Sequence, residues 1–124
     1  MEDHEMIDCQ RMNIDAARFA TVVRFCKPRI AGLAEVEELG QQLYQIVEQQ
    51  RPSRLLLDLS GVQFLSSAAL GKLIALNARV KAQDGVMRLC NVQPDTLRIF
   101  HACQLDRIFE IHSGTTDATA SWVS

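Results

Sequence analysis

The sequence predicts an α/β fold in which helical crossovers connect a mixed sheet of four to five strands. Short apolar and β-branched runs alternate along the chain with segments of helical periodicity. Residues 55–57 are three consecutive leucines, a run that suits a strand covered on both faces, as in a parallel sheet. Pro28, Pro52 and Gly85 interrupt the pattern between segments. The predicted order is ββαβαβαβ, and the sequence leaves a final helix open.

The first two predicted strands lie before the first helix. Residues 6–12 mix apolar and polar side chains and are interpreted as an edge strand, whereas residues 13–18 contain turn formers. Residues 19–26 are rich in β-branched and aromatic side chains and predict a strand. Pro28 ends it, and a loop is expected to about residue 33.

Residues 34–50 predict an amphipathic helix. One face carries apolar residues at spacings of three and four, and Glu and Gln fill the other face. Pro52 stops this helix. The apolar positions are Val36, Leu39, Leu43, Ile46 and Val47.

The central segment predicts a strand, a turn and a helix. The leucine run is closed by Asp58, and a turn follows at Ser60-Gly61. The next helix is expected to begin near Ser67 and to end before Asp84-Gly85. Residues 86–90 then form another predicted strand.

The last third of the chain predicts a helix and a short strand. Pro94 and Asp95 open the helix, and residues 107–112 are expected to be the last strand. Residues 114–124 are small and polar apart from Trp122, and residues 1–5 are acidic. Both ends are interpreted as flexible tails. A docked terminal helix is the alternative for residues 114–124.

Composition restricts the classes of function. The 124 residues suit a single domain over 1–124, and an apolar share of 48% with 23% charged residues indicates a compact fold. The net charge of −2 without a basic block gives no reason to expect nucleic acid. No apolar run approaches the roughly 20 residues of a membrane span, and the acidic first ten residues do not resemble a secretory signal. We therefore expect a cytoplasmic protein; the sequence does not decide its oligomeric state.

The cysteines and histidines do not indicate a metal site. The cysteines form no C-x-x-C pair and the histidines are scattered, so we expect no metal and no cofactor. The cysteines are interpreted as reduced thiols in or near strands that act as small buried hydrophobic residues. They are Cys9, Cys26, Cys90 and Cys103, and the histidines are His4, His101 and His112.

Two adjacent hydroxyls at a predicted helix start are the main candidate functional residues. Backbone N–H groups lack partners there and the helix dipole is positive, so the position favours a phosphate or another anion. The two hydroxyls are those of Ser66 and Ser67. The competing structural interpretation makes Ser67 the helix N-cap. Asp58 is expected to stabilise the turn rather than to take part in catalysis.

The same segment resembles a known family. The run LLLDLSGVQFLSSAALGKL at residues 55–73 is similar to the STAS domain, and in particular to small bacterial anti-sigma factor antagonists. In the family pattern an apolar-aromatic pair precedes Asp-Ser-Ser/Thr-Gly-Leu, which Phe64 and Leu65 match, with Ser67 at the phosphorylatable serine. Residues 7–25 and 84–111 resemble the family's opening strands and its later strand, Pro-led helix and final strand. The resemblance implies a STAS-like fold over nearly the whole chain.

The resemblance also implies a function. Antagonists of this family bind an anti-sigma factor that is a serine kinase, which releases the sigma factor, and phosphorylation of the serine ends the complex. For this chain, the resemblance therefore implies a partner-binding surface and no enzymatic activity. The implied surface consists of Lys27, Arg29, Phe64, Leu65, Ser66, Ser67, Ala68 and Ala69.

This sequence departs from the family pattern at three places, and the first departure makes Ser66 the alternative phosphoacceptor. The first and the third departures favour a second hypothesis. Ser66 replaces the family Asp, Ala69 replaces the Gly, and Lys27 and Arg29 replace acidic residues of the loop after the second strand. The alternative is a STAS subunit that is not phosphorylated and serves as a permanent interface in a signalling assembly or a lipid-transport complex. A hydrolase is not expected, because the nucleophile-elbow pattern Gly-x-Ser-x-Gly is absent around Ser67.

Overall fold

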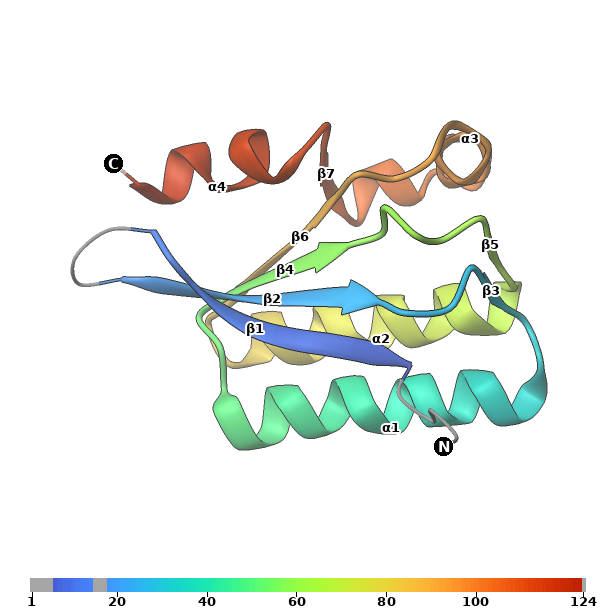
Figure 1. The fold of residues 1–124 in the computed structure, drawn as a ribbon, viewed down its shortest axis with the longest axis horizontal. Helices are drawn as coiled ribbons and strands as arrows, with labels where there is room; N and C mark the ends of the chain where they lie inside the picture. Colours follow the sequence, from blue (N-terminus) through green and yellow to red (C-terminus); the bar gives the residue numbers. More distant parts are fainter. Residues whose placement is uncertain (1–5, 15–17, 124) are drawn as a thin grey trace.

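The computed structural model describes residues 6–14 and 18–123, and its main sheet has five strands in the order β1-β2-β4-β6-β7 (Figure 1). β1 pairs antiparallel with β2, and the remaining pairs are parallel. The strands are β1 (Ile7–Asn13), β2 (Phe19–Phe25), β4 (Arg54–Asp58), β6 (Val86–Cys90) and β7 (Glu110–His112). Parallel neighbours require crossovers, which are α1 (Leu33–Gln50), α2 (Ser67–Ala82) and α3 (Pro94–Ala102). The predicted α/β class with a mixed sheet is confirmed.

α1 and α2 cover one face of the sheet side by side and build the main core (Figure 1). The helical periodicity predicted for α1 is confirmed, because the stripe at Val36, Leu39, Leu43 and Val47 is buried. The sheet contributes Val23, Phe25, Leu55, Leu57 and Leu89 to the same cluster.

The opposite face carries a second, smaller core beneath α4 (Thr115–Val123). Leu56 lies there with Ala118 and Trp122, while its neighbours Leu55 and Leu57 face α1 and α2. The leucine run is therefore buried on both faces, as expected for a parallel strand.

Arg88 fastens α4 to the sheet. Its guanidinium lies 4.5 Å from the ring centroid of Trp122, donates a hydrogen bond of 2.8 Å to the carbonyl of Ala118 and pairs with Glu110 at 2.9 Å. The residues expected to be a tail or a docked helix thus include a docked helix over Thr115–Val123.

Two short elements differ from the prediction. The loop expected at residues 28–33 contains a two-residue strand, β3 (Arg29–Ile30), which pairs in parallel with β5 (Phe64–Leu65). The last strand is shorter than the predicted 107–112, because Leu105–Arg107 form a 3-10 turn whose carbonyl at Leu105 accepts the N–H groups of Ile108 and Phe109. The predicted tail at 1–5 and the middle of the predicted turn, 15–17, lie outside the described residues.

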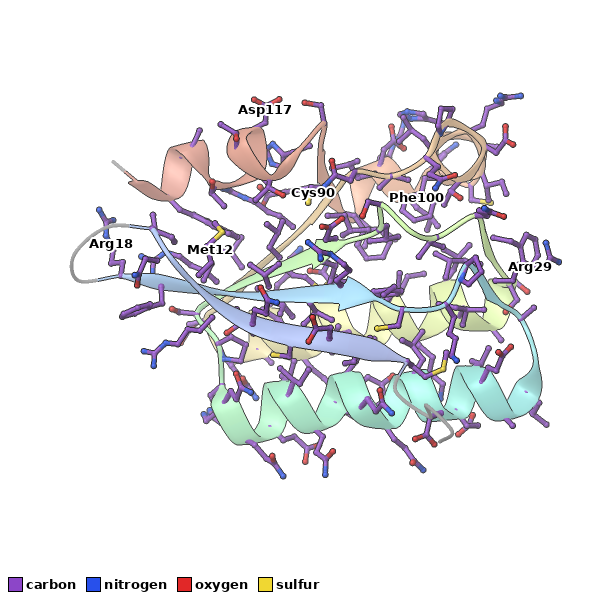
Figure 2. The ribbon with its side chains drawn as sticks, in the orientation of Figure 1. Met12, Arg18, Arg29, Cys90, Phe100 and Asp117 are labelled. Carbon is purple, nitrogen blue, oxygen red and sulfur yellow. The ribbon has the colours of Figure 1, made fainter. Side chains whose placement is uncertain are left out.

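Burial of the cysteines was predicted wrongly for three of the four. Cys90 is buried in the second core, where Figure 2 shows it between β6 and α4, but Cys9, Cys26 and Cys103 are exposed. Cys9 lies on the edge strand β1, and Cys26 and Cys103 follow the ends of β2 and α3, where the core no longer covers them. All four thiols are free.

Candidate functional site

The turn that leads to α2 is organised by Asp58 at the end of β4. Its Oδ1 accepts hydrogen bonds from the backbone N–H of Ser60 at 3.0 Å and from the side-chain amide of Asn91 at 3.1 Å. Its Oδ2 lies 3.4 Å from Nε of Arg24. The contact with Ser60 confirms the turn-stabilising role predicted for Asp58.

These contacts keep Asp58 ionised although it is buried. Burial alone would raise the pKa of its carboxyl group, but the hydrogen bonds from Ser60 and Asn91 and the charge of Arg24 outweigh it, so the pKa is lowered. A carboxylate held in this way is a structural acceptor. Sequence analysis did not identify Arg24 or Asn91 as its partners.

The β3–β5 ribbon brings two distant segments together at the start of α2. The carbonyl of Pro28 accepts the N–H groups of Gln63 at 2.7 Å and Phe64 at 3.0 Å, and Ser66 N–H donates to the carbonyl of Ile30 at 3.0 Å. Arg29 is therefore in register with Phe64, and its guanidinium lies 4.8 Å from the centroid of the Phe64 ring. The cationic loop and the serine segment predicted from sequence form one surface.

The two serines have different roles at the start of α2. Ser66 is the N-cap, with its Oγ accepting the N–H of Ala69 at 3.2 Å. Ser67 is the first helical residue; it is exposed, and its hydroxyl makes no hydrogen bond within the described part of the chain. The interpretation of Ser67 as the N-cap is therefore wrong, because the helix begins one residue earlier than that interpretation requires. The hydroxyl of Ser66 is thus occupied by the cap hydrogen bond, whereas the hydroxyl of Ser67 is available to a partner.

The residues predicted to contact a partner differ in exposure. Arg29, Ser67 and Ala68 are exposed, and Figure 2 shows Arg29 at the periphery of the molecule beside β3. Lys27, Phe64 and Ser66 are partly buried. Leu65 and Ala69 are buried in the main core, 4% and 0% exposed, so their side chains are not available to a partner.

Leu33 belongs to this end of the molecule and was not predicted. It is the first residue of α1, and 79% of it is exposed, the largest fraction among the exposed large hydrophobic residues. α1 and α2 begin at the same end of the molecule (Figure 1). Leu33 continues the apolar stripe of α1 by the spacing of three, and only the structure shows that the described residues leave it uncovered.

The surface around the start of α2 is apolar and cationic. The first turn of α2 contains no acidic residue, and Arg29 forms no ion pair with a described carboxylate. Lys72, one turn further on, is already paired with Glu37 of α1 at 3.3 Å. The arrangement suits an acidic group on a partner, or a phosphate on Ser67.

No group of three or more His, Cys, Asp or Glu side chains in residues 6–14 and 18–123 could hold a metal ion. Within the same residues, no helix has both the length and the apolar character needed to cross a bilayer.

The chain was compared with known families and structures. A family model described as the STAS domain matches residues 15–118. An anti-sigma-factor antagonist (STAS) domain protein from Planctomyces limnophilus is 24% identical with a TM-score of 0.78, over 95% of this chain and 98% of that chain. An anti-sigma factor antagonist from Mycobacterium paratuberculosis is 25% identical with a TM-score of 0.74, over 93% and 92%.

A third structure is of a phosphorylated protein. The Bacillus cell fate determinant SpoIIAA in its phosphorylated form is 16% identical to this chain with a TM-score of 0.63, over 94% of this chain and 100% of that chain. At this identity the likeness concerns the fold.

Proposed function

The chain belongs to the STAS domain family, and on that premise we propose that it is a cytoplasmic, non-enzymatic regulator of the anti-sigma factor antagonist kind. It binds an anti-sigma factor with serine kinase activity and is switched by phosphorylation of Ser67. The observation that carries this proposal is the exposed hydroxyl of Ser67, which has no hydrogen bond to any described residue and lies in the same surface as the exposed Arg29 and Ala68 and the partly buried Phe64.

The position of Ser67 suits a phosphate that leaves the fold unchanged. Phosphorylation adds a charge of about −1.5 to −2 at neutral pH, which the positive end of the α2 dipole stabilises. No carboxylate in the first turn of α2 repels that charge. Because the hydroxyl of Ser67 makes no hydrogen bond to a described residue, its phosphorylation removes none. A partner packed closely on the bare hydroxyl is displaced by the bulk and charge of the phosphate.

Ser66 supports this assignment although it departs from the family Asp. Both residue types cap helices well, and Ser66 does so through Ala69. The substitution therefore keeps the helix start and removes one negative charge next to the phosphoacceptor. The partner surface that meets Arg29 is expected to be acidic.

The first test is the mass of the protein isolated from its own cells. Trypsin releases residues 55–72 as one peptide, which contains both Ser66 and Ser67, and fragment ions that cut between them assign a phosphate. Phosphate on Ser67 is the expected result. Phosphate on Ser66 instead would contradict the assignment, because that hydroxyl is engaged as the cap.

A binding experiment tests the switch itself. We expect Ser67→Asp to abolish binding to an anti-sigma kinase of the source organism in titration calorimetry, and Ser67→Ala to bind as the unmodified protein does. Ser66→Ala is the matched control, since it removes a hydroxyl from the same turn without adding charge. Equal binding by Ser67→Asp and the unmodified protein would contradict the switch.

The alternative function is a permanent STAS interface in a signalling assembly or a lipid-transport complex. Ser66 in place of the family Asp and the cationic loop at Lys27 and Arg29 favour it, because both depart from the pattern of the phosphorylated antagonists. Absence of phosphate under all growth conditions, together with tight binding by Ser67→Asp, would support this alternative.

A further inference from the structure

β1 leaves one edge of the main sheet open. It is the outermost strand, and no described residue pairs with its outer side. Its seven residues contain no proline, and residues 8–11 are all exposed. A long open edge presents backbone N–H and C=O groups to which another strand can bind.

The pairing with β2 determines which backbone groups face outward. Cys26 N–H donates to the carbonyl of Met6, and Ile14 N–H donates to the carbonyl of Arg18. Both pairs belong to the register Ile7↔Phe25, in which paired residue numbers sum to 32. Hydrogen-bonded pairs alternate along an antiparallel ladder, so the even-numbered residues of β1 bond to β2. The N–H and C=O groups of Ile7, Cys9, Arg11 and Asn13 therefore point to the open edge.

An open groove of about 780 Å³ lies between β1 and α1. Its lining includes one carboxylate of α1, that of Glu38, and no Lys or Arg side chain. Glu38 is held in place by Gln42, whose side-chain amide donates to Glu38 and whose carbonyl oxygen accepts the N–H of Met6. No described cation pairs with Glu38. The groove is suited to receive a positive side chain.

We propose that β1 pairs antiparallel with β1 of a second copy of the chain, about a two-fold axis through Gln10. In this register Gln10 faces its own copy, Cys9 faces Arg11, and Ile7 faces Asn13. All seven residues pair, and only outward-facing odd residues exchange hydrogen bonds. The sheets of the two copies, with five strands each, become one continuous sheet.

Charge favours a second copy as the occupant of this edge. The register places each Arg11 opposite Cys9, at the groove that holds Glu38 of the other copy. In the single chain Arg11 stacks over Phe19 at 4.0 Å, an exposed contact that the long side chain can exchange for a place in this groove, whose lining contains no other cation. Because β1 carries one negative and one positive residue, Asp8 and Arg11, pairing with itself adds no net charge to the interface. The inference does not depend on the proposed function, since it uses no residue of the surface around Ser67.

The first arm of the test is the mass in solution. Sedimentation equilibrium over about two orders of magnitude in concentration should show the mass rising from 13.9 kDa toward twice that value. Cys9→Pro removes an outward N–H but no bond to β2, and proline is tolerated at such edge positions. It should raise the dimer dissociation constant at least about tenfold, whereas Cys9→Ser should not. A constant monomer mass, or an unchanged constant in Cys9→Pro, would overturn the proposal.

The second arm tests the register and remains informative if Cys9→Pro fails to fold. The background is Cys9→Ser, Cys26→Ser and Cys103→Ser, which leaves only the buried Cys90. Added to it, Gln10→Cys places two thiols opposite each other in a non-hydrogen-bonded pair about 4.5 Å apart at Cα, within disulfide range. Asp8→Cys is the control on the same face, because its two copies lie four residues out of register, about 13 Å apart. Gln10→Cys should give a disulfide-linked dimer on mild oxidation and Asp8→Cys should not; equal yields would refute the register.

Discussion

Replacement of Ser66 by alanine should destabilise the protein by about 1 kcal/mol, within a range of roughly 0.5–2 kcal/mol. Ser66 is partly buried, and its Oγ is the acceptor for the N–H of Ala69 in the first turn of α2. Ser66→Ala leaves that N–H without this partner. The backbone bond from Ser66 N–H to Ile30 is unaffected by the substitution, so the loss isolates the cap.

Two neighbouring substitutions should behave differently. Ser67→Ala removes an exposed hydroxyl without a hydrogen bond in the described structure, and alanine has the higher helix propensity, so stability should stay equal or rise by up to about 0.5 kcal/mol. Ser66→Asp keeps a capping oxygen and adds a charge that the helix dipole favours by about 0.3–1 kcal/mol. The expected order of stability is thus Ser66→Asp at or above the unmodified protein, and Ser66→Ala below it.

Urea unfolding followed by far-UV circular dichroism measures these differences. The urea midpoint should fall for Ser66→Ala with an unchanged slope, which identifies a change in stability alone. In thermal unfolding the same loss corresponds to a Tm lower by about 4 °C. If Ser67→Ala costs as much as Ser66→Ala, the cap is shared or shifted by one residue, and the assignment of Ser67 as the available hydroxyl fails.

Three further perturbations test other parts of the structure. Folding lowers the pKa of Asp58, so its contribution to stability is complete above the unfolded pKa of about 3.9 and is lost as the pH falls through the lower folded pKa. The urea midpoint should therefore decrease as the pH is lowered across this range. Asp58→Asn should make the midpoint less dependent on pH. Gly85→Ala should cost about 1–3 kcal/mol in urea unfolding, because its Cβ would lie 2.8 Å from the carbonyl oxygen of Pro52; a loss below about 0.5 kcal/mol would show that β6 shifts freely. Trp122→Ala should cost about 3 kcal/mol by removing the ring on which Arg88 stacks, and an unchanged midpoint would mean that α4 is undocked in solution.

The regular elements could be predicted from the sequence because their patterns are long. The stripe of α1 from Val36 to Val47 repeats over about three turns, and the leucine run of β4 is unbroken. Such patterns specify burial directly, so β6 at Val86–Cys90 and the start of α3 at Pro94 agree with the prediction.

The candidate site was less predictable because its decisive features are short or non-local. β3 and β5 have two residues each, too few for any periodicity, and they exist only because their backbones pair with each other. Ser66 and Ser67 are chemically identical, so the sequence does not determine which one caps α2. Exposure of Leu33 and Cys9 depends on where the core ends, which is a property of the assembled layers.

The separation of the core into two faces sets an order of events during synthesis. The second cluster needs Ala118, which follows Cys90 by 28 positions (118 − 90), and translation at about 5–20 residues per second makes that interval roughly 1–6 s. Until then Ala20, Leu56 and Cys90 present apolar surface to water even though every strand before β7 has been made. The nascent chain therefore exposes the apolar surface of the second core, to which chaperones bind, after β6 emerges and before α4 can dock.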